Sequence, residues 1–138
     1  MFLGIDTSNY KTSLGLVNKE GEVLRDLRKP LSVPLGSLGL RQQEAVFQHL
    51  ANLPELFQRI SDLNIKEELL SVSASTKPRP IEDSYMPCFK AGEAFARTVS
   101  SVLGIPYLSF SHQEGHLAAA FEKSEFADEK DFLAFHLS

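Results

Sequence analysis

The chain has little of what marks a secreted, membrane or zinc-knuckle protein. Its one cysteine, Cys88, has no second cysteine with which to form an intramolecular disulfide or a zinc knuckle, and we interpret it as a buried or incidental thiol. No apolar run approaches the roughly 20 residues needed to cross a bilayer, and the N-terminus lacks the features of a signal peptide. We therefore expect a cytoplasmic protein with no membrane partner.

A strong net charge is lacking too. A charge of -4 over 138 residues gives no global field that would draw the chain onto nucleic acid, so RNA binding would need a local basic patch or a partner. With 43% hydrophobic and 23% charged residues, the composition is that of one ordinary soluble domain with one core.

Hydrophobic patterning predicts three strands followed by alternating helices and strands. The strands Phe2–Thr7 and Thr12–Val17, and a third that begins at Val23, should form an antiparallel meander. Helices are expected at Gln42–Ile60 with a kink at Pro54, at Phe89–Leu103, and from His112 to about Phe121 after an N-cap at Ser111; strands are expected at Leu69–Ala74, Tyr107–Phe110 and Phe132–Leu137.

The polar segment Ser75–Pro87 looks too irregular to continue the strand before it. The later strands should be parallel because helices connect them. This order is typical of an α/β, ribonuclease H-like fold and of each lobe of the actin/hexokinase class, with a mixed sheet flanked by helices. The fold alone leaves the function open.

The first strand ends in a loop suited to a charged ligand. A carboxylate at Asp6 can face a cleft and hold a hydrated magnesium ion, and the loop Thr7–Ser13 offers hydroxyls, backbone donors and a lysine to a phosphate. The alternative is a polar β-hairpin in which Asp6 and Ser8 satisfy their own turn.

A histidine pair stands at the start of the last predicted helix. His112 and His116 are four residues apart, which on a helix places both imidazoles on one face at a separation suited to a shared metal. Two histidines alone do not make a site, and the metalloprotease motif His-Glu-x-x-His is excluded because Gln113 follows the first histidine. The alternative is structural, with His112 capping the helix and His116 half-buried. The remaining histidines, His49 and His136, are interpreted as ordinary helix and strand residues.

Two segments carry the motifs of a known family. Gly4–Thr12 reads Gly-Ile-Asp-Thr-Ser-Asn-Tyr-Lys-Thr, beside a family sequence Gly-Ile-Glu-Thr-Ser-Cys-Asp-Glu-Thr. Gly104–Pro106, a strand and then His112–Leu117 follow the pattern Gly-Ile-Pro, strand, His-x-Glu-Gly-His-Leu. In these motifs the chain resembles the glycoprotease (O-sialoglycoprotein endopeptidase) and tRNA N6-adenosine threonylcarbamoyltransferase family over nearly its whole length. The resemblance implies that residues 1–138 are the N-terminal lobe of a two-lobed actin-like ATPase fold, with the second lobe absent.

The resemblance also implies cofactors and partners. In the family the two histidines bind a metal together with an aspartate of the second lobe, so we expect iron or zinc at His112 and His116, and an adenine nucleotide. The residues expected on the nucleotide side are Asp6, Thr7, Ser8, Lys11 and Thr12. The expected partners are the missing C-terminal lobe, tRNA and other threonylcarbamoylation proteins, and the isolated lobe is a candidate homodimer through any apolar surface that the second lobe would cover.

The sequence departs from the family at two places. Asn9, Tyr10 and Lys11 replace the family's Cys-Asp-Glu, which removes two carboxylates. Thr76–Pro80 replaces a Thr-x-Gly-Pro-Gly loop and adds Lys77 and Arg79, which are candidates for a phosphate or RNA backbone or else belong to a solvated loop.

Three functions follow for the full-length protein. The first is a metal-dependent threonylcarbamoyl transfer to an adenosine of tRNA, which the histidine pair favours. The second is a noncatalytic paralogue that binds metal or nucleotide as a partner protein. The replacement of the family's Cys-Asp-Glu by Asn9, Tyr10 and Lys11 favours it. The third, a ribonuclease H-like nuclease, would need carboxylates converging with Asp6, which Asp83 and Asp131 do not obviously supply.

Overall fold

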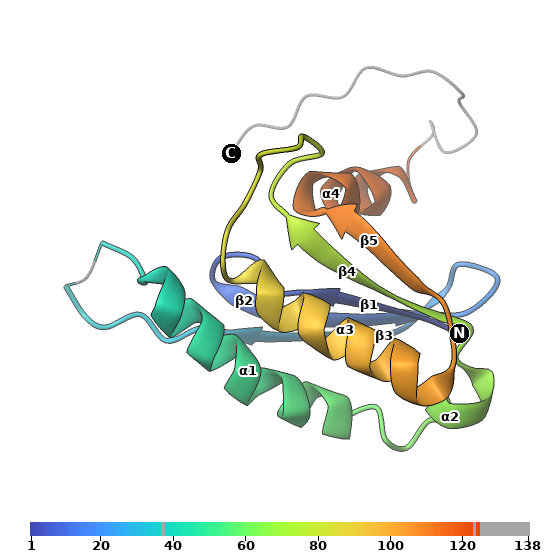
Figure 1. Cartoon of the computed structure of the whole chain (residues 1–138). Helices are drawn as coiled ribbons and strands as arrows, with labels where there is room; N and C mark the ends of the chain where they lie inside the picture. The colour runs from blue at the N-terminus through green and yellow to red at the C-terminus, as the bar shows by residue number, and fades with distance from the viewer. Residues whose placement is uncertain (37, 123, 125–138) are drawn as a thin grey trace.

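Five strands form one mixed sheet in the computed structural model, which describes residues 1–36, 38–122 and 124 (Figure 1). The strands are β1 (Phe2–Asp6), β2 (Lys11–Val17), β3 (Val23–Pro30), β4 (Ser71–Lys77) and β5 (Tyr107–Ser111), in the spatial order β3-β2-β1-β4-β5. The first three pair antiparallel, and β1 with β4 and β4 with β5 pair parallel. The predicted meander and the predicted parallel strands are confirmed, and the fold is a ribonuclease H-like lobe.

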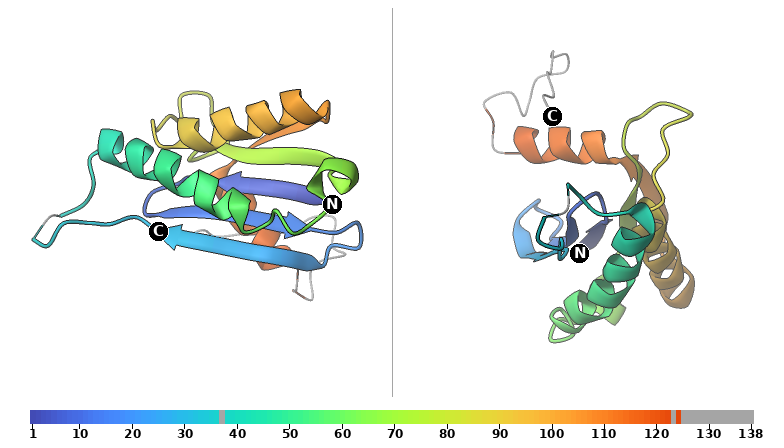
Figure 2. Two further views of the ribbon diagram at one scale, coloured as in Figure 1. Left: turned by 90° about the horizontal axis from the view of Figure 1, so that it is seen from below. Right: turned by 90° about the vertical axis from the view of Figure 1, so that its left-hand side faces the viewer.

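The helices lie on both faces of this sheet. They are α1 (Gln42–Gln58), α2 (Ile65–Glu68), α3 (Phe89–Leu103) and α4 (His112–Phe121). The end-on view in Figure 2 shows α1 and α3 against one face and α4 on the opposite side. Within the described residues, no helix combines the length and the apolar character that crossing a membrane requires.

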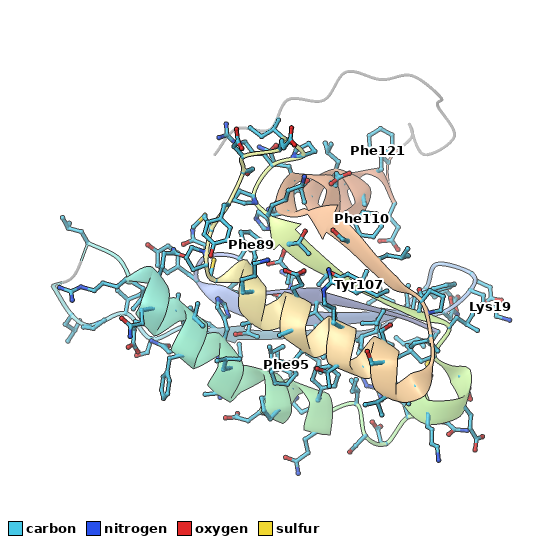
Figure 3. The ribbon with its side chains drawn as sticks, viewed as in Figure 1. Lys19, Phe89, Phe95, Tyr107, Phe110 and Phe121 are labelled. Carbon is cyan, nitrogen blue, oxygen red and sulfur yellow. The ribbon has the colours of Figure 1, made fainter. Side chains whose placement is uncertain are left out.

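The core lies between the sheet and the α1 and α3 pair. Alternation along β1 buries Leu3 and Ile5 on this side, while Gly4 and Asp6 project to the other. Leu53 of α1 is fully buried, and Phe95 of α3 stacks on Phe57 of α1 with ring centroids 5.9 Å apart (Figure 3). The two helices therefore bury an apolar face on the sheet, as the sequence predicts, but Leu50 and Val102, which the same helical spacing placed on these faces, are exposed.

Three sequence expectations need correction in this part of the chain. Strand β4 does not stop at Ala74 but continues to Lys77. It continues because the backbone of β4 pairs with that of its parallel neighbour β5, with Ser75 opposite Phe110 and Lys77 opposite Ser111. Backbone hydrogen bonds form with polar residues as readily as with apolar ones. The short helix α2 was not predicted. Helix α1 runs from Gln42 through Pro54 as one helix and ends two residues before the predicted end. The strand predicted at Phe132–Leu137 lies outside the described residues.

Candidate functional site

The carboxyl ends of the three parallel strands bring the site together. Asp6 ends β1, Ser75 lies in the last part of β4, and His112 follows directly on β5 as the first residue of α4. Ligand sites of open α/β sheets lie at this edge, because strand ends and helix N-termini meet there. Residues distant in sequence thus share one small region of the molecule.

Asp6 is the centre of this group. Its Oδ1 accepts the backbone N–H of Ser8 at 2.8 Å and also the Ser8 hydroxyl, so the turn considered from the sequence is present. Its Oδ2 accepts the Ser75 hydroxyl at 2.6 Å and lies 2.9 Å from Nδ1 of His112. Burial would raise the pKa of Asp6, but the hydrogen bonds from His112, Ser75 and Ser8 outweigh it and hold the pKa of this carboxyl well below its ordinary value. Asp6 is therefore an anion at neutral pH.

The histidine pair stands on the first turn of α4. Ser111 caps the helix through a capping box in which its hydroxyl accepts the N–H of Glu114 at 3.2 Å and the Glu114 carboxylate accepts the N–H of Ser111 at 2.7 Å. The N-cap is the one predicted, so the alternative in which His112 caps the helix is wrong. The helix starts at His112 because this box fixes the turn.

The two imidazoles converge. Nε2 of His112 and Nε2 of His116 are 2.8 Å apart, and the rings meet edge to face at 80°. The buried ring of Phe89 lies beside His112, with centroids 6.3 Å apart. Two imidazole nitrogens that converge from one helical turn can occupy two adjacent coordination positions of one metal ion.

The described residues fit half of a metal centre. Among them no group of three or more His, Cys, Asp or Glu side chains is placed to hold a metal. Structural zinc sites take four protein ligands and catalytic sites three, so the pair fits a metal only with ligands from water, a bound substrate or residues beyond those described. His112 and His116 are accordingly a two-histidine half-site.

A cleft of about 930 Å³ opens between the sheet and α4. Small residues (Gly4, Ser13, Gly15 and Ser73) line the sheet side, and Gly115, His116 and Ala119 line the α4 side. Phe110 of β5 also lines it and lies beside α4 in Figure 3. Small side chains leave the sheet surface open, so a flat ligand has room to lie on it.

One charged pair of strand residues, Asp26 and Arg28, lines this cleft and was missed in the sequence. Arg28 donates to both carboxylate oxygens of Asp26 at 2.8 Å, and the register places Arg28 opposite Ser13 and Asp26 opposite Gly15. The apolar residues Val23, Leu24 and Leu27 predicted strand β3 from the sequence, but they did not predict the register that places its charges at the cleft. Lys11, predicted on the nucleotide side, lines the cleft at the same end.

Not all of the predicted cofactor residues reach the cleft. Asp6, Ser8 and Lys11 line it, whereas Thr7 and Thr12 are fully buried. Thr7 donates to the carbonyl of Cys88 at 2.9 Å and accepts the N–H of Gly92 at 3.1 Å, which ties the end of β1 to α3. These hydroxyls hold the loop in place, and their bonds to protein make them unavailable to a ligand in this structure.

A buried histidine lies under the same loop. His49 is fully buried, its Nδ1 lies 2.8 Å from Oγ1 of Thr12, and Asn52 donates to that oxygen at 3.1 Å. Its Nε2 has no hydrogen-bond partner among the described residues. Burial lowers the pKa of His49, although the nearby Asp6 charge and a backbone interaction with Asn9 oppose this. The sequence pattern placed His49 on the apolar face of α1, but it gave no sign of the Thr12 contact.

The other candidates lie outside the cleft. Lys77 donates to the carbonyl of Ile81 at 3.4 Å, and neither Lys77 nor Arg79 is among the residues that line it. Asp83 does not line it either, so within the described part of the chain the carboxylate cluster of a nuclease is not formed. Cys88 is buried, and burial raises the pKa of its thiol. Asp131 and His136 lie outside the described residues.

Comparison with known proteins identifies relatives of this chain. No family model matches it. It is 28% identical over 116 residues to the tRNA N6-adenosine threonylcarbamoyltransferase of Methanopyrus kandleri, covering 83% of this chain and 32% of that protein. For the enzymes of the same name from Pyrobaculum calidifontis and Thermus thermophilus the identities are 29% and 28%, with 87% and 86% of this chain and 34% and 36% of theirs covered.

A solved structure shares the fold. YeaZ from Pseudomonas aeruginosa superposes with a TM-score of 0.58 at 14% identity, over 88% of this chain and 48% of that one. The chain is thus a distant homologue of the N-terminal third of threonylcarbamoyltransferases, and it spans about a third of the length of those relatives.

Proposed function

We propose that this chain is a metal- and nucleotide-binding lobe of a threonylcarbamoyltransferase-like protein, with His112 and His116 as its metal ligands. The observation that carries the proposal is the convergence of their Nε2 atoms, 2.8 Å apart, in the lining of the cleft. A divalent ion bound there would supply a Lewis acid that polarises a phosphoryl or carbonyl oxygen.

The charges of the cleft fit an anionic ligand. The amine of Lys11 makes no hydrogen bond or ion pair with another described residue, and it lines the cleft together with the guanidinium of Arg28. Lys11 is therefore the group we assign to a ligand phosphate. The anionic Asp6 is covered by its four hydrogen bonds, so its charge is largely compensated before a phosphate approaches.

The shape of the cleft fits the rest of a nucleotide. The sheet side carries Gly4 and Gly15, neither of which projects a side chain, and a planar base or ribose can approach the backbone there. Transfer of the threonylcarbamoyl group to a tRNA adenosine is the activity we propose for the whole protein, on the strength of its distant homology.

A second candidate is a noncatalytic partner that keeps the binding site. The specific observation in its favour is the loop Asn9–Lys11, where Tyr10 and Lys11 line the cleft at positions that are acidic in the family motif. A cation there reverses the local charge, so it favours binding of phosphate over proton transfer by a carboxylate.

Nucleotide binding tests the proposal and separates the candidates. Titration of ATP into the chain, with and without Zn²⁺, should give saturable binding that Lys11→Ala weakens at least fivefold. Lys19→Ala is the matched control, because Lys19 is exposed in the turn after β2, away from α4 (Figure 3). No ATP binding by the wild type would reject the nucleotide site.

A second assay addresses the transfer itself. Unmodified tRNA is incubated with threonylcarbamoyl-adenylate and the whole protein, in which this lobe is joined to its second lobe, and its nucleosides are then analysed by mass spectrometry. Modified adenosine above the protein-free control supports the transferase, and ATP binding without modification supports the noncatalytic partner.

A further inference from the structure

The Asp6 carboxylate has no free position for a ligand of its own. A carboxylate accepts about four hydrogen bonds, and Asp6 receives four from protein donors. Two come from Ser8 and one each from Ser75 and His112. A magnesium ion would have to displace one of these donors, so Asp6 is poorly placed for the metal role considered from the sequence.

We propose that Asp6 is instead a positioning residue that sets the tautomer of His112 and so presents the Nε2 lone pair of that ring toward His116. The inference deepens the proposed function, on which its metal-binding part rests. The hydrogen bond between Asp6 and His112 joins groups 106 residues apart in the chain, so it is a product of the fold and not of a local turn.

The tautomer follows from the partners of each ring nitrogen. Asp6 is an acceptor only, so Nδ1 of His112 carries the hydrogen that is donated over 2.9 Å. In the neutral ring Nε2 is then an acceptor, and in this structure it accepts the Nε2 hydrogen of His116 at 2.8 Å; a metal ion bound between the rings would take the place of that hydrogen. The opposite tautomer would direct a lone pair at the carboxylate and a hydrogen at the metal position. A metal-bound histidine is normally held in this way by a carboxylate or carbonyl behind it.

Three elements hold Asp6 in place for this role. Ser8 fixes Oδ1 from the loop after β1, and Ser75, which is buried in β4, fixes Oδ2 from the neighbouring strand. The loop is anchored in turn by Thr7, whose hydroxyl bonds to Cys88 of the segment that leads into α3. The carboxylate therefore has little freedom to turn away from His112.

The test combines a spectroscopic measurement with a metal titration. Long-range proton–nitrogen correlation spectra of the ¹⁵N-labelled chain at pH 7.5 should show the hydrogen of His112 on Nδ1, and Asp6→Asn should abolish this preference. Zn²⁺ affinity of Asp6→Asn should fall by about 10- to 100-fold. Asp62→Asn is the matched control, because it removes a carboxylate from an exposed pair with Arg25 and should change Zn²⁺ affinity less than twofold.

The outcomes are distinct. A hydrogen on Nε2 of His112 in the wild type, or Zn²⁺ affinity of Asp6→Asn within twofold of the wild type, overturns the inference. The wild-type spectrum decides the case even if Asp6→Asn does not fold. If the wild type binds no Zn²⁺, the metal part of the proposed function fails, while the tautomer still shows whether Asp6 orients His112.

Discussion

Replacing Gly92 by alanine should destabilise the protein, although alanine is the better helix former. Gly92 lies in α3 where the helix crosses the end of β1, and a Cβ built there would lie 2.9 Å from Oγ1 of Thr7 and 3.3 Å from Cγ2 of Ile5. Thr7 is fully buried, and its hydroxyl is held by the carbonyl of Cys88 and the N–H of Gly92. A methyl group at Gly92 must therefore push α3 away from the strand that ends in Asp6.

The expected magnitude combines two opposing effects. Alanine in a helix interior gains about 0.5 to 1 kcal/mol over glycine. Overpacking by one methyl group in a close-packed core costs about 1 to 3 kcal/mol. The difference spans about 0 to 2.5 kcal/mol, so the free energy of unfolding should fall by about 1 kcal/mol, which for a domain of this size lowers the Tm by roughly 3 to 4 °C.

Urea unfolding followed by circular dichroism measures this change, with Gly115→Ala as the matched control. Gly115 also lies inside a helix, but a Cβ there meets nothing within 4 Å, so this variant should gain about 0.5 to 1 kcal/mol. In a Thr7→Ala background the cost of Gly92→Ala should shrink, because its nearest contact is gone. Stabilisation by Gly92→Ala comparable to that by Gly115→Ala would refute the close approach of α3 to β1.

Three further predictions concern other contacts of the fold. Burial places the pKa of His49 below its unfolded value of about 6.5. The folded protein therefore resists protonation of His49 and loses stability as the pH falls below that value. The free energy of unfolding of His49→Asn should vary less between pH 7 and 5 than that of the wild type. Ser111→Ala should lower the free energy of unfolding in urea by about 1 kcal/mol, because it removes the N-cap of α4. It should also weaken Zn²⁺ binding, because the capping box orients the first turn of α4. An unchanged Zn²⁺ affinity would contradict that role. Leu53→Ala at the fully buried position of α1 should cost about 2 to 5 kcal/mol, whereas Leu50→Ala on its partly exposed face should cost less than half of that; equal costs would contradict the orientation of α1.

The order of elements could be predicted because each has a strong local signal. Helix α3 begins and ends where expected, since Gly104 takes the left-handed conformation that stops a helix and Pro106 follows it. Helix α4 begins at His112 as expected because Ser111 is a good N-cap. The extension of β4 to Lys77 could not be predicted, because it depends on pairing with β5, about thirty residues later.

The site was predictable only in part, for the same reason. The spacing of His112 and His116 indicated a shared position for the two rings, and the structure brings their Nε2 atoms within 2.8 Å. The contact of Asp6 with His112 and Ser75 required the parallel register of three strands. Thr7 was expected in the site as part of a loop that offers hydroxyls to a phosphate, but here its hydroxyl bonds to backbone groups at the start of α3.

Metal binding by the histidine pair is the central claim, and one titration tests it most directly. Zn²⁺ is titrated into the wild-type chain, into His112→Ala and His116→Ala, and into Gln113→Ala, which alters the same helix turn outside the cleft. The account predicts one saturable site per chain that both histidine variants lose and Gln113→Ala retains. No stoichiometric site in the wild type, or equal binding by the histidine variants, would contradict it.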